Sequence, residues 1–161
     1  MKIVIQRVTH SSVKVNDEII SSIGRGLLVL IGIGREDTQE DVNYAVKKIL
    51  NVKFFDNEDG KKWSKSVMDK QYEVMCVSQF TLCNSLKGNK LDFHHAMKPD
   101  ESQKFYEHIL ERLKCQYDPD KIKEGMFGAL MQVELCNDGP VTISLSSNKG
   151  EKEKNVESTE S

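Results

Sequence analysis

One segment constrains the fold of this chain more than any other. Residues 26–33 read GLLVLIGI, so that every position is apolar or glycine. A strand with one solvent-facing side alternates apolar and polar residues, whereas an unbroken apolar run is typical of a central strand covered on both faces. The sequence therefore predicts a sheet in which residues 26–33 are the core strand.

Two amphipathic helices are available to pack on such a sheet. The first follows Thr38, a residue type that caps helices, and the second follows Pro99, which suits a first helical turn. Both carry an apolar stripe at helical spacing: Val42, Ala45, Val46, Ile49 and Leu50 in the first, and Phe105, Tyr106, Ile109, Leu110 and Leu113 in the second.

The remaining predicted elements are short strands with mainly hairpin connections. Near the N-terminus three β-rich runs indicate an antiparallel meander, and later segments suggest two further strands and then a closing pair joined tightly through residues 137–140. The expected strands are Lys2–Val8, Ser12–Val15, Ile19–Ile23, Val52–Phe55, Tyr72–Val77, Leu130–Leu135 and Val141–Leu145. This pattern predicts an α+β domain with mainly antiparallel β-sheets.

Composition limits what the protein can be. A chain of 161 residues fits one domain, and we assign it to residues 1–147, because 148–161 is charged and nearly devoid of apolar side chains, as in a disordered tail. No signal peptide or membrane span is visible, so we expect a soluble, cytoplasmic protein without membrane contact.

The four cysteines lack CxxC spacing and read as thiols, mostly core filler. The net charge of −2 argues against a protein that coats long nucleic acid but not against a grip on one RNA end.

Two short motifs draw attention, although each is weak alone. Ser78-Gln79-Phe80-Thr81 follows a predicted strand and offers hydroxyls, an amide and an aromatic ring, which equally describes a polar strand end. Asn137-Asp138-Gly139-Pro140 is typical of a turn. They gain weight from three companions along the chain: Lys87-Gly88-Asn89 with Asp92-Phe93-His94, Phe127-Gly128 with Met131, and Gln6-Arg7-Val8.

Taken in their order and spacing along the chain, these motifs resemble those of the D-aminoacyl-tRNA deacylases, over roughly residues 1–146. The chain departs from the family pattern at Leu91, where the family usually has Pro, and at Ser11, where Ala is common. The resemblance implies a deacylase-like, layered β/α/β fold that works as a homodimer. It also implies an ester substrate, a D-amino acid joined to the terminal adenosine at the 3′ end of tRNA, and neither a metal nor a cofactor.

The resemblance also gives expected roles to individual residues. Ser78, Gln79, Phe80 and Thr81 form the catalytic segment; we expect the amides of Gln79 and Phe80 to stabilise the oxyanion. Thr81 lacks a neighbouring base, so we expect it to position groups while the substrate 2′-hydroxyl or a water assists. The remaining site residues are the Gly139-Pro140 chirality gate, in a cis conformation and acting across the dimer, and the adenosine- or tRNA-binding Phe127, Gly128, Met131 and Lys87.

Other interpretations remain open from the sequence. The same fold could serve as a non-catalytic DNA-binding module, with the tail as an accessory contact. A related branch of the family has a different amino-acid preference, but it carries Pro at the position of Ser78. His94 and His95 are adjacent and point to opposite faces of an extended segment, which disfavours a zinc site, and a Ser78–His94 catalytic pair is conceivable.

Overall fold

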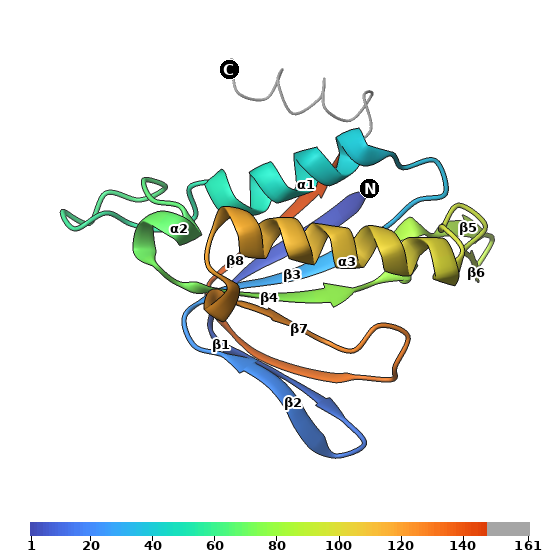
Figure 1. The fold of residues 1–161 in the computed structure, drawn as a ribbon, viewed down its shortest axis with the longest axis horizontal. Coiled ribbons are helices and arrows are strands. Elements are labelled where there is room, and N and C mark those ends of the chain that lie inside the picture. Colours follow the sequence, from blue (N-terminus) through green and yellow to red (C-terminus); the bar gives the residue numbers. More distant parts are fainter. Residues whose placement is uncertain (148–161) are drawn as a thin grey trace.

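The computed structural model describes residues 1–147, and the tail expected over 148–161 lies outside the described residues. The main sheet has six strands: β1 (Lys2–Val15), β2 (Glu18–Ile23), β3 (Gly26–Gly32), β4 (Glu73–Ser78), β7 (Ile122–Glu124) and β8 (Gln132–Ser146). Two long helices, α1 (Gln39–Asn51) and α3 (Pro99–Gln116), lie side by side on one face of this sheet (Figure 1). Shorter elements are α2 (Val67–Lys70), the 3₁₀ turns η1 (Phe80–Cys83) and η2 (Pro119–Lys121), and a separate hairpin of β5 (Ser85–Lys87) and β6 (Lys90–Asp92).

The core strand and both helices are where the sequence predicts them. In β3, Leu27, Val29 and Ile31 face the core under the helices, and Leu28 faces a second core on the opposite side of the sheet. Thr38 precedes α1 and its amide donates to Asp41 Oδ2 at 2.8 Å, as in a helix cap. Pro99 occupies the first turn of α3. The α+β class is confirmed.

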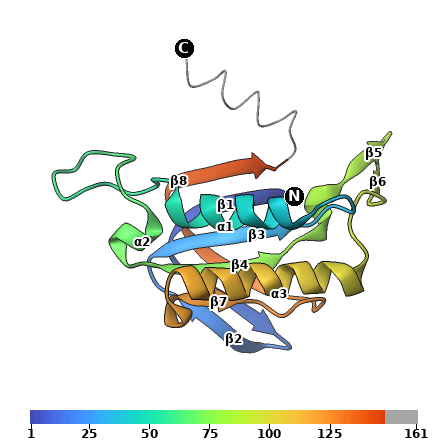
Figure 2. The same cartoon turned by 45° about the horizontal axis from the view of Figure 1, so that its top comes forward.

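The main sheet contains both antiparallel and parallel strand pairs. β1 pairs antiparallel with β2, β3 and β8, but β3 pairs parallel with β4, and β4 parallel with β7. β2 also contacts β4 and β7, so the sheet curls toward closure around the second core. One chain thus holds a single mixed, nearly closed sheet with both long helices on one face, in place of separate antiparallel sheets in β/α/β layers (Figure 2).

Three predictions about the strands are wrong. The first two N-terminal runs form one strand, β1, which pairs with β8 with two register shifts, one between Gln6 and Val8 and one between Val8 and His10. Residues 52–55 form no strand; Phe55 makes only an isolated bridge to Lys65, and Phe54 and Phe55 are buried in the helix–sheet core.

The third correction concerns residues 137–140, which do not join two antiparallel strands. Both halves of β8 run in one direction along β1, with Asn137 opposite Val8 and Thr142 opposite Gln6. The intervening residues 138–141 therefore face Arg7 alone and bulge from a continuous strand. Bulge and turn sequences share Gly, Asn and Asp, so the motif could not distinguish them.

Candidate active site

The catalytic segment begins where β4 ends beside the core strand. Ser78 is the last residue of β4 and lies in register with Ile31 of β3. The chain then turns into η1, and it can turn tightly because Gly32 has no side chain. A Cβ at Gly32 would lie 2.7 Å from Leu82 Cβ and 2.9 Å from the Gln79 carbonyl oxygen, closer than packed atoms tolerate. Gly32 thus determines how closely η1 packs on β3.

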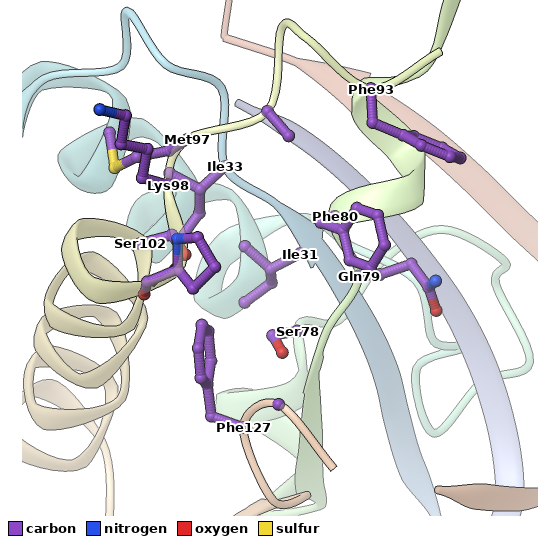
Figure 3. A pocket seen from close by; sticks show the side chains of 13 residues that line it. Ile31, Ile33, Ser78, Gln79, Phe80, Phe93, Met97, Lys98, Ser102 and Phe127 are labelled. Carbon is purple, nitrogen blue, oxygen red and sulfur yellow. Dashed lines mark hydrogen bonds between the residues drawn. The ribbon is translucent and has the colours of Figure 1, made fainter. Parts of the chain in front are cut away.

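A cavity of about 480 Å³ opens between this strand end, the start of α3 and the loop that carries Phe127. Figure 3 shows Ser78 and Phe127 facing the same hollow, with Met97, Lys98 and Ser102 on the side of α3. Its walls are mostly apolar, as is usual for small-molecule sites. The lining residues are Ile31, Ile33, Ser78, Gln79, Phe80, Phe93, Ala96, Met97, Lys98, Pro99, Ser102, Phe127 and Gly128.

Three of the four catalytic-segment residues line this cavity, and Thr81 does not. The Gln79 side chain points away from Phe127 (Figure 3), and its Nε2 donates to Thr81 Oγ1 at 2.5 Å. Thr81 therefore accepts a hydrogen bond from Gln79 beside the cavity. Phe80 is 59% exposed and packs edge-on against Phe93, with ring centroids 5.2 Å apart.

The expected pair of oxyanion donors needs correction. The Gln79 amide donates to the Ile31 carbonyl at 2.7 Å and is thus already used within the fold. The Phe80 amide stands at the start of η1, where a helix offers its amides no internal acceptor. No hydrogen bond among residues 1–147 uses it. Phe80 is therefore the backbone donor that remains for a ligand.

Phe127 and Gly128 form the wall opposite Ser78. The Phe127 ring lies 5.7 Å from that of Tyr106, whose hydroxyl donates a buried hydrogen bond to the Cys76 carbonyl at 3.0 Å. Desolvation by burial raises the pKa of Tyr106 well above its usual value, so this hydroxyl stays protonated and remains a donor. Gly128 adopts φ +75°, which favours glycine.

Met131, expected beside Phe127, does not line the cavity. It packs against the second core, and a Cβ at Gly125 would lie 2.7 Å from its Sδ. Met131 is thus a partly buried residue at the edge of the second core.

Sequence reasoning missed the α3 side of the site. Lys98 and Ser102 flank Pro99, whose helix-start signal gave no hint that a cavity lies there. Among the lining residues, all within the described chain, Lys98 is the one with an ionisable side chain. The cavity therefore holds no carboxylate or imidazole that could serve as a general base.

Lys87 lies outside the cavity, on the β5–β6 hairpin, 71% exposed and 3.8 Å from Asp92. Asp92 also bonds His94, and that hydrogen bond lowers the pKa of Asp92 to about 2. His94 is thus engaged by Asp92, and no hydrogen bond between residues 1–147 joins it to Ser78.

Within residues 1–147 no cluster of three or more His, Cys, Asp and Glu residues is arranged to hold a metal ion. No described helix is long and apolar enough to cross a membrane.

Gly139 and Pro140 lie far from this cavity within one chain. Their peptide bond is cis, and Arg7 holds the bulge by donating to the Asp138 carbonyl at 3.0 Å and to the Phe54 carbonyl at 2.6 Å. Arg7 pairs with Leu27 at one end of β3, whereas Ser78 pairs with Ile31 toward the other. Four residues of strand separate the two positions by about 13 Å along the sheet.

Comparison with known proteins yields one consistent family. The D-Tyr-tRNA(Tyr) deacylase family matches residues 4–146. D-aminoacyl-tRNA deacylase 1 of Homo sapiens is 59% identical over 147 residues, which cover 91% of this chain and 70% of the human protein. D-aminoacyl-tRNA deacylase of Dictyostelium discoideum is 56% identical over 148 residues, 91% of this chain and 98% of that protein.

Two solved structures share the fold. A protein described as c-Myc DNA Unwinding Element Binding Protein superposes with a TM-score of 0.89 at 59% identity, covering 92% of this chain and 99% of its own. A probable eukaryotic D-amino acid tRNA deacylase superposes with a TM-score of 0.76 at 19% identity, covering 89% and 97%. The second likeness concerns the fold alone.

Proposed function

Because the chain belongs to the D-Tyr-tRNA(Tyr) deacylase family and is a D-aminoacyl-tRNA deacylase, we propose that its cavity binds the aminoacylated terminal adenosine of tRNA and cleaves the ester there. The observation that carries this proposal is the position of the family segment Ser78-Gln79-Phe80 on the cavity wall, at a strand end facing Phe127. The aromatic face of Phe127 suits the adenine ring, and Gly128 lets the backbone approach it. We place this activity in the cytoplasm, in translation quality control.

The reaction is ester hydrolysis without an acid–base side chain. Water adds to the ester carbonyl, the tetrahedral oxyanion collapses, and the ribose 3′-oxygen leaves with a proton, which gives a free amino acid and tRNA. The Phe80 amide is the donor for the oxyanion, and one such donor contributes about 3 kcal/mol to the transition state. The Ser78 hydroxyl points into the cavity (Figure 3) and is the second polar group that can bind the reacting ester.

Proton transfer then falls to the substrate itself. The vicinal ribose 2′-hydroxyl orients the water or relays its proton, because the lining residues supply no base. Thr81 and Gln79 support the turn through their mutual hydrogen bond and form no covalent intermediate. If an acyl-threonine accumulated on the wild type and Thr81→Ala abolished turnover, this part of the mechanism would be wrong.

Selection against L-amino acids is assigned to Gly139 and Pro140 of a second subunit. Within one chain the bulge is separated from Ser78 along the sheet, so it can reach a cavity only in a homodimer. Arg7 holds the bulge rigid enough to present backbone carbonyls to the substrate ammonium, and an L side chain would meet the same backbone. Lys87, exposed beside the cavity, meets a phosphate of the tRNA.

The decisive assay compares D-tyrosyl-tRNA with L-tyrosyl-tRNA at catalytic protein concentration. We expect rapid loss of the D ester and retention of the L ester. A D-tyrosyl-tRNA that ends in 3′-amino-3′-deoxyadenosine binds as a stable amide, and one with a 2′-deoxyadenosine end tests the 2′-hydroxyl. Full cleavage of the 2′-deoxy ester would remove substrate assistance from the mechanism.

One solved relative favours a second candidate function. The structure described as c-Myc DNA Unwinding Element Binding Protein is 59% identical to this chain, so DNA binding on the same fold is the alternative. It predicts saturable binding of duplex DNA that a Phe127→Ala variant leaves unchanged, whereas deacylation is lost. Absence of DNA binding at physiological salt, together with D-ester cleavage, leaves the deacylase alone.

A further inference from the structure

The β5–β6 hairpin is inserted directly into the rim of the cavity. It spans Ser85 to Asp92, and the residues on either side of it in sequence, Phe80 and Phe93, both line the cavity and pack against each other. Figure 2 shows the hairpin projecting from the body at the end where α3 begins. A ligand that extends out of the cavity at this rim therefore lies next to the hairpin.

The hairpin carries an apolar pair that no residue of the described part of the chain covers. Leu86 and Leu91 are direct cross-strand partners and are 65% and 55% exposed. Residues two apart on an extended segment share a face, so Leu91 lies on the side of Phe93. A two-stranded hairpin with bare leucines is marginally stable in water, which suggests that this face has a binding partner.

The polar groups of the hairpin indicate the charge of that partner. Lys87 and Lys90 pair at its tip, next to the Gly88-Asn89 turn, and both are exposed. The carboxylate opposite them is not free, because Asp92 bonds His94 and Ser85 and lies 3.8 Å from Lys87 Nζ. No ion pair among residues 1–147 involves Lys90. As the next cross-strand pair after Leu86 and Leu91, the two lysines start on the other face of the hairpin and present positive charge at its tip.

We propose that this hairpin is a docking arm for the unpaired 3′ strand of the substrate tRNA. The bases that precede the terminal adenosine lie against Phe80, Phe93 and the Leu86–Leu91 pair, and their phosphates lie against Lys90 and Lys87. A single strand is the partner that combines flat apolar groups with regular negative charge. The proposal rests on the proposed function, since it requires that terminal adenosine occupy the adjoining cavity.

The test separates the cavity from the arm by substrate length. D-tyrosyl-adenosine fills only the cavity, whereas D-tyrosyl-tRNA reaches the hairpin. For the double variant Leu86→Ser with Leu91→Ser, and separately for Lys90→Glu, we expect KM for the tRNA to rise about ten-fold or more, with KM for D-tyrosyl-adenosine unchanged. The matched control is Ile19→Ser with Ile20→Ser, two exposed apolar residues on β2, which should change neither value.

The KM values of the variants on the two substrates decide whether the hairpin binds the tRNA strand. Equal KM values for wild type and variants on the tRNA overturn the docking arm, as does an equal rise for both substrates, which would mean that the hairpin only shapes the cavity. If the serine pair fails to fold, Lys90→Glu alone gives the same comparison. A lower mass of the serine variant in sedimentation would show that a second copy of the chain covers the leucines, which also overturns the proposal. Failure of the wild type on both substrates would instead refute the proposed function.

Discussion

The Gln79 amide donates to the Ile31 carbonyl at 2.7 Å, so the turn after β4 continues the pairing of β4 with the core strand for one more residue. This bond removes one expected oxyanion donor and fixes the next amide, that of Phe80, at the cavity wall. The position of that donor is therefore set by how closely η1 packs on β3. Gly32 is the residue that permits this packing.

Gly32→Ala should impair catalysis more than folding. The added Cβ would lie 2.7 Å from Leu82 Cβ, so η1 must shift outward and carry the Phe80 amide with it. We expect kcat/KM for D-tyrosyl-tRNA to fall about 10- to 100-fold and stability to fall by about 1–3 kcal/mol. Steady-state kinetics and urea unfolding measure the two effects.

Gly24→Ala is the matched control, because a Cβ there meets only the end of the Glu73 side chain at 3.6 Å. It should leave kcat/KM unchanged. Equal activity of the Gly32→Ala protein and the wild type would show that η1 does not hold a catalytic group.

Tyr106→Phe tests the support behind Phe127. The substitution keeps the ring that packs on Phe127 but removes the buried hydrogen bond to the Cys76 carbonyl. That carbonyl still accepts from the Gly125 amide at 2.9 Å, so the expected loss is about 1 kcal/mol, measured by urea unfolding. Tyr117→Phe, whose hydroxyl bonds the Tyr72 carbonyl nearer the surface, is the comparison and should cost less. A loss for Tyr106→Phe no larger than that of Tyr117→Phe would contradict this account.

The sequence predicted the elements whose signals are local and missed those that depend on distant pairing. The apolar run at 26–33 and the stripes of α1 and α3 are visible in the sequence because the residues buried in the core are themselves apolar. The parallel pairing of β4 and the continuity of β8 through Gly139 depend on which strand lies alongside, and no local pattern encodes that choice.

The same distinction holds within the site. The segment Ser78-Gln79-Phe80 was predictable because its motif is contiguous, and it does line the cavity. Lys98 and Ser102 were not, since they reach the cavity only through the packing of α3 on the sheet. Met131 follows Phe127 closely in sequence, but Phe127 packs against the helix–sheet core and Met131 against the second core, a difference that no local pattern encodes.

The cysteines should fall into two reactivity classes. Cys76 and Cys83 are buried, and burial raises the pKa of both thiols, that of Cys76 to about 12. The exposed Cys115 and Cys136 are open to reagents, so only these two thiols should react with a disulfide reagent at pH 8 in the native protein, and all four after unfolding. The expectation that cysteines are mostly core filler is right for Cys76 and Cys83 alone. Rapid native labelling of Cys76 would show that the core opens.

The hairpin should lose its Asp92–His94 contact only in strong acid. The hydrogen bond from His94 lowers the pKa of Asp92 to about 2. A carboxyl whose folded pKa is depressed contributes stability above its unfolded value, near 3.8, and loses it as the pH falls toward 2. Carboxyl carbon NMR should therefore show Asp92 titrating near pH 2 in the wild type. In His94→Ala it should titrate near its ordinary value, and an unchanged midpoint would assign the shift to another cause.

Arg7→Lys should weaken chiral selection while leaving ester cleavage largely intact. Arg7 reaches the Phe54 and Asp138 carbonyls at once, through Nη1 and Nε, and Asp138 directly precedes Gly139. A lysine keeps the charge opposite the Asp138 carboxylate, 3.4 Å from Arg7 Nε, but its single ammonium cannot span both carbonyls. The bulge then gains freedom, and if it forms the chiral gate of a second subunit, L-tyrosyl-tRNA should be admitted. We expect the ratio of kcat/KM for the D and L esters to fall about ten-fold or more, because discrimination depends on a rigid backbone.

Arg25→Lys is the control, since Arg25 reaches Asp138 only at 3.8 Å and is 60% exposed. An unchanged D/L ratio in a correctly folded Arg7→Lys protein would mean that the Gly139-Pro140 bulge does not select chirality, whatever its effect on the dimer.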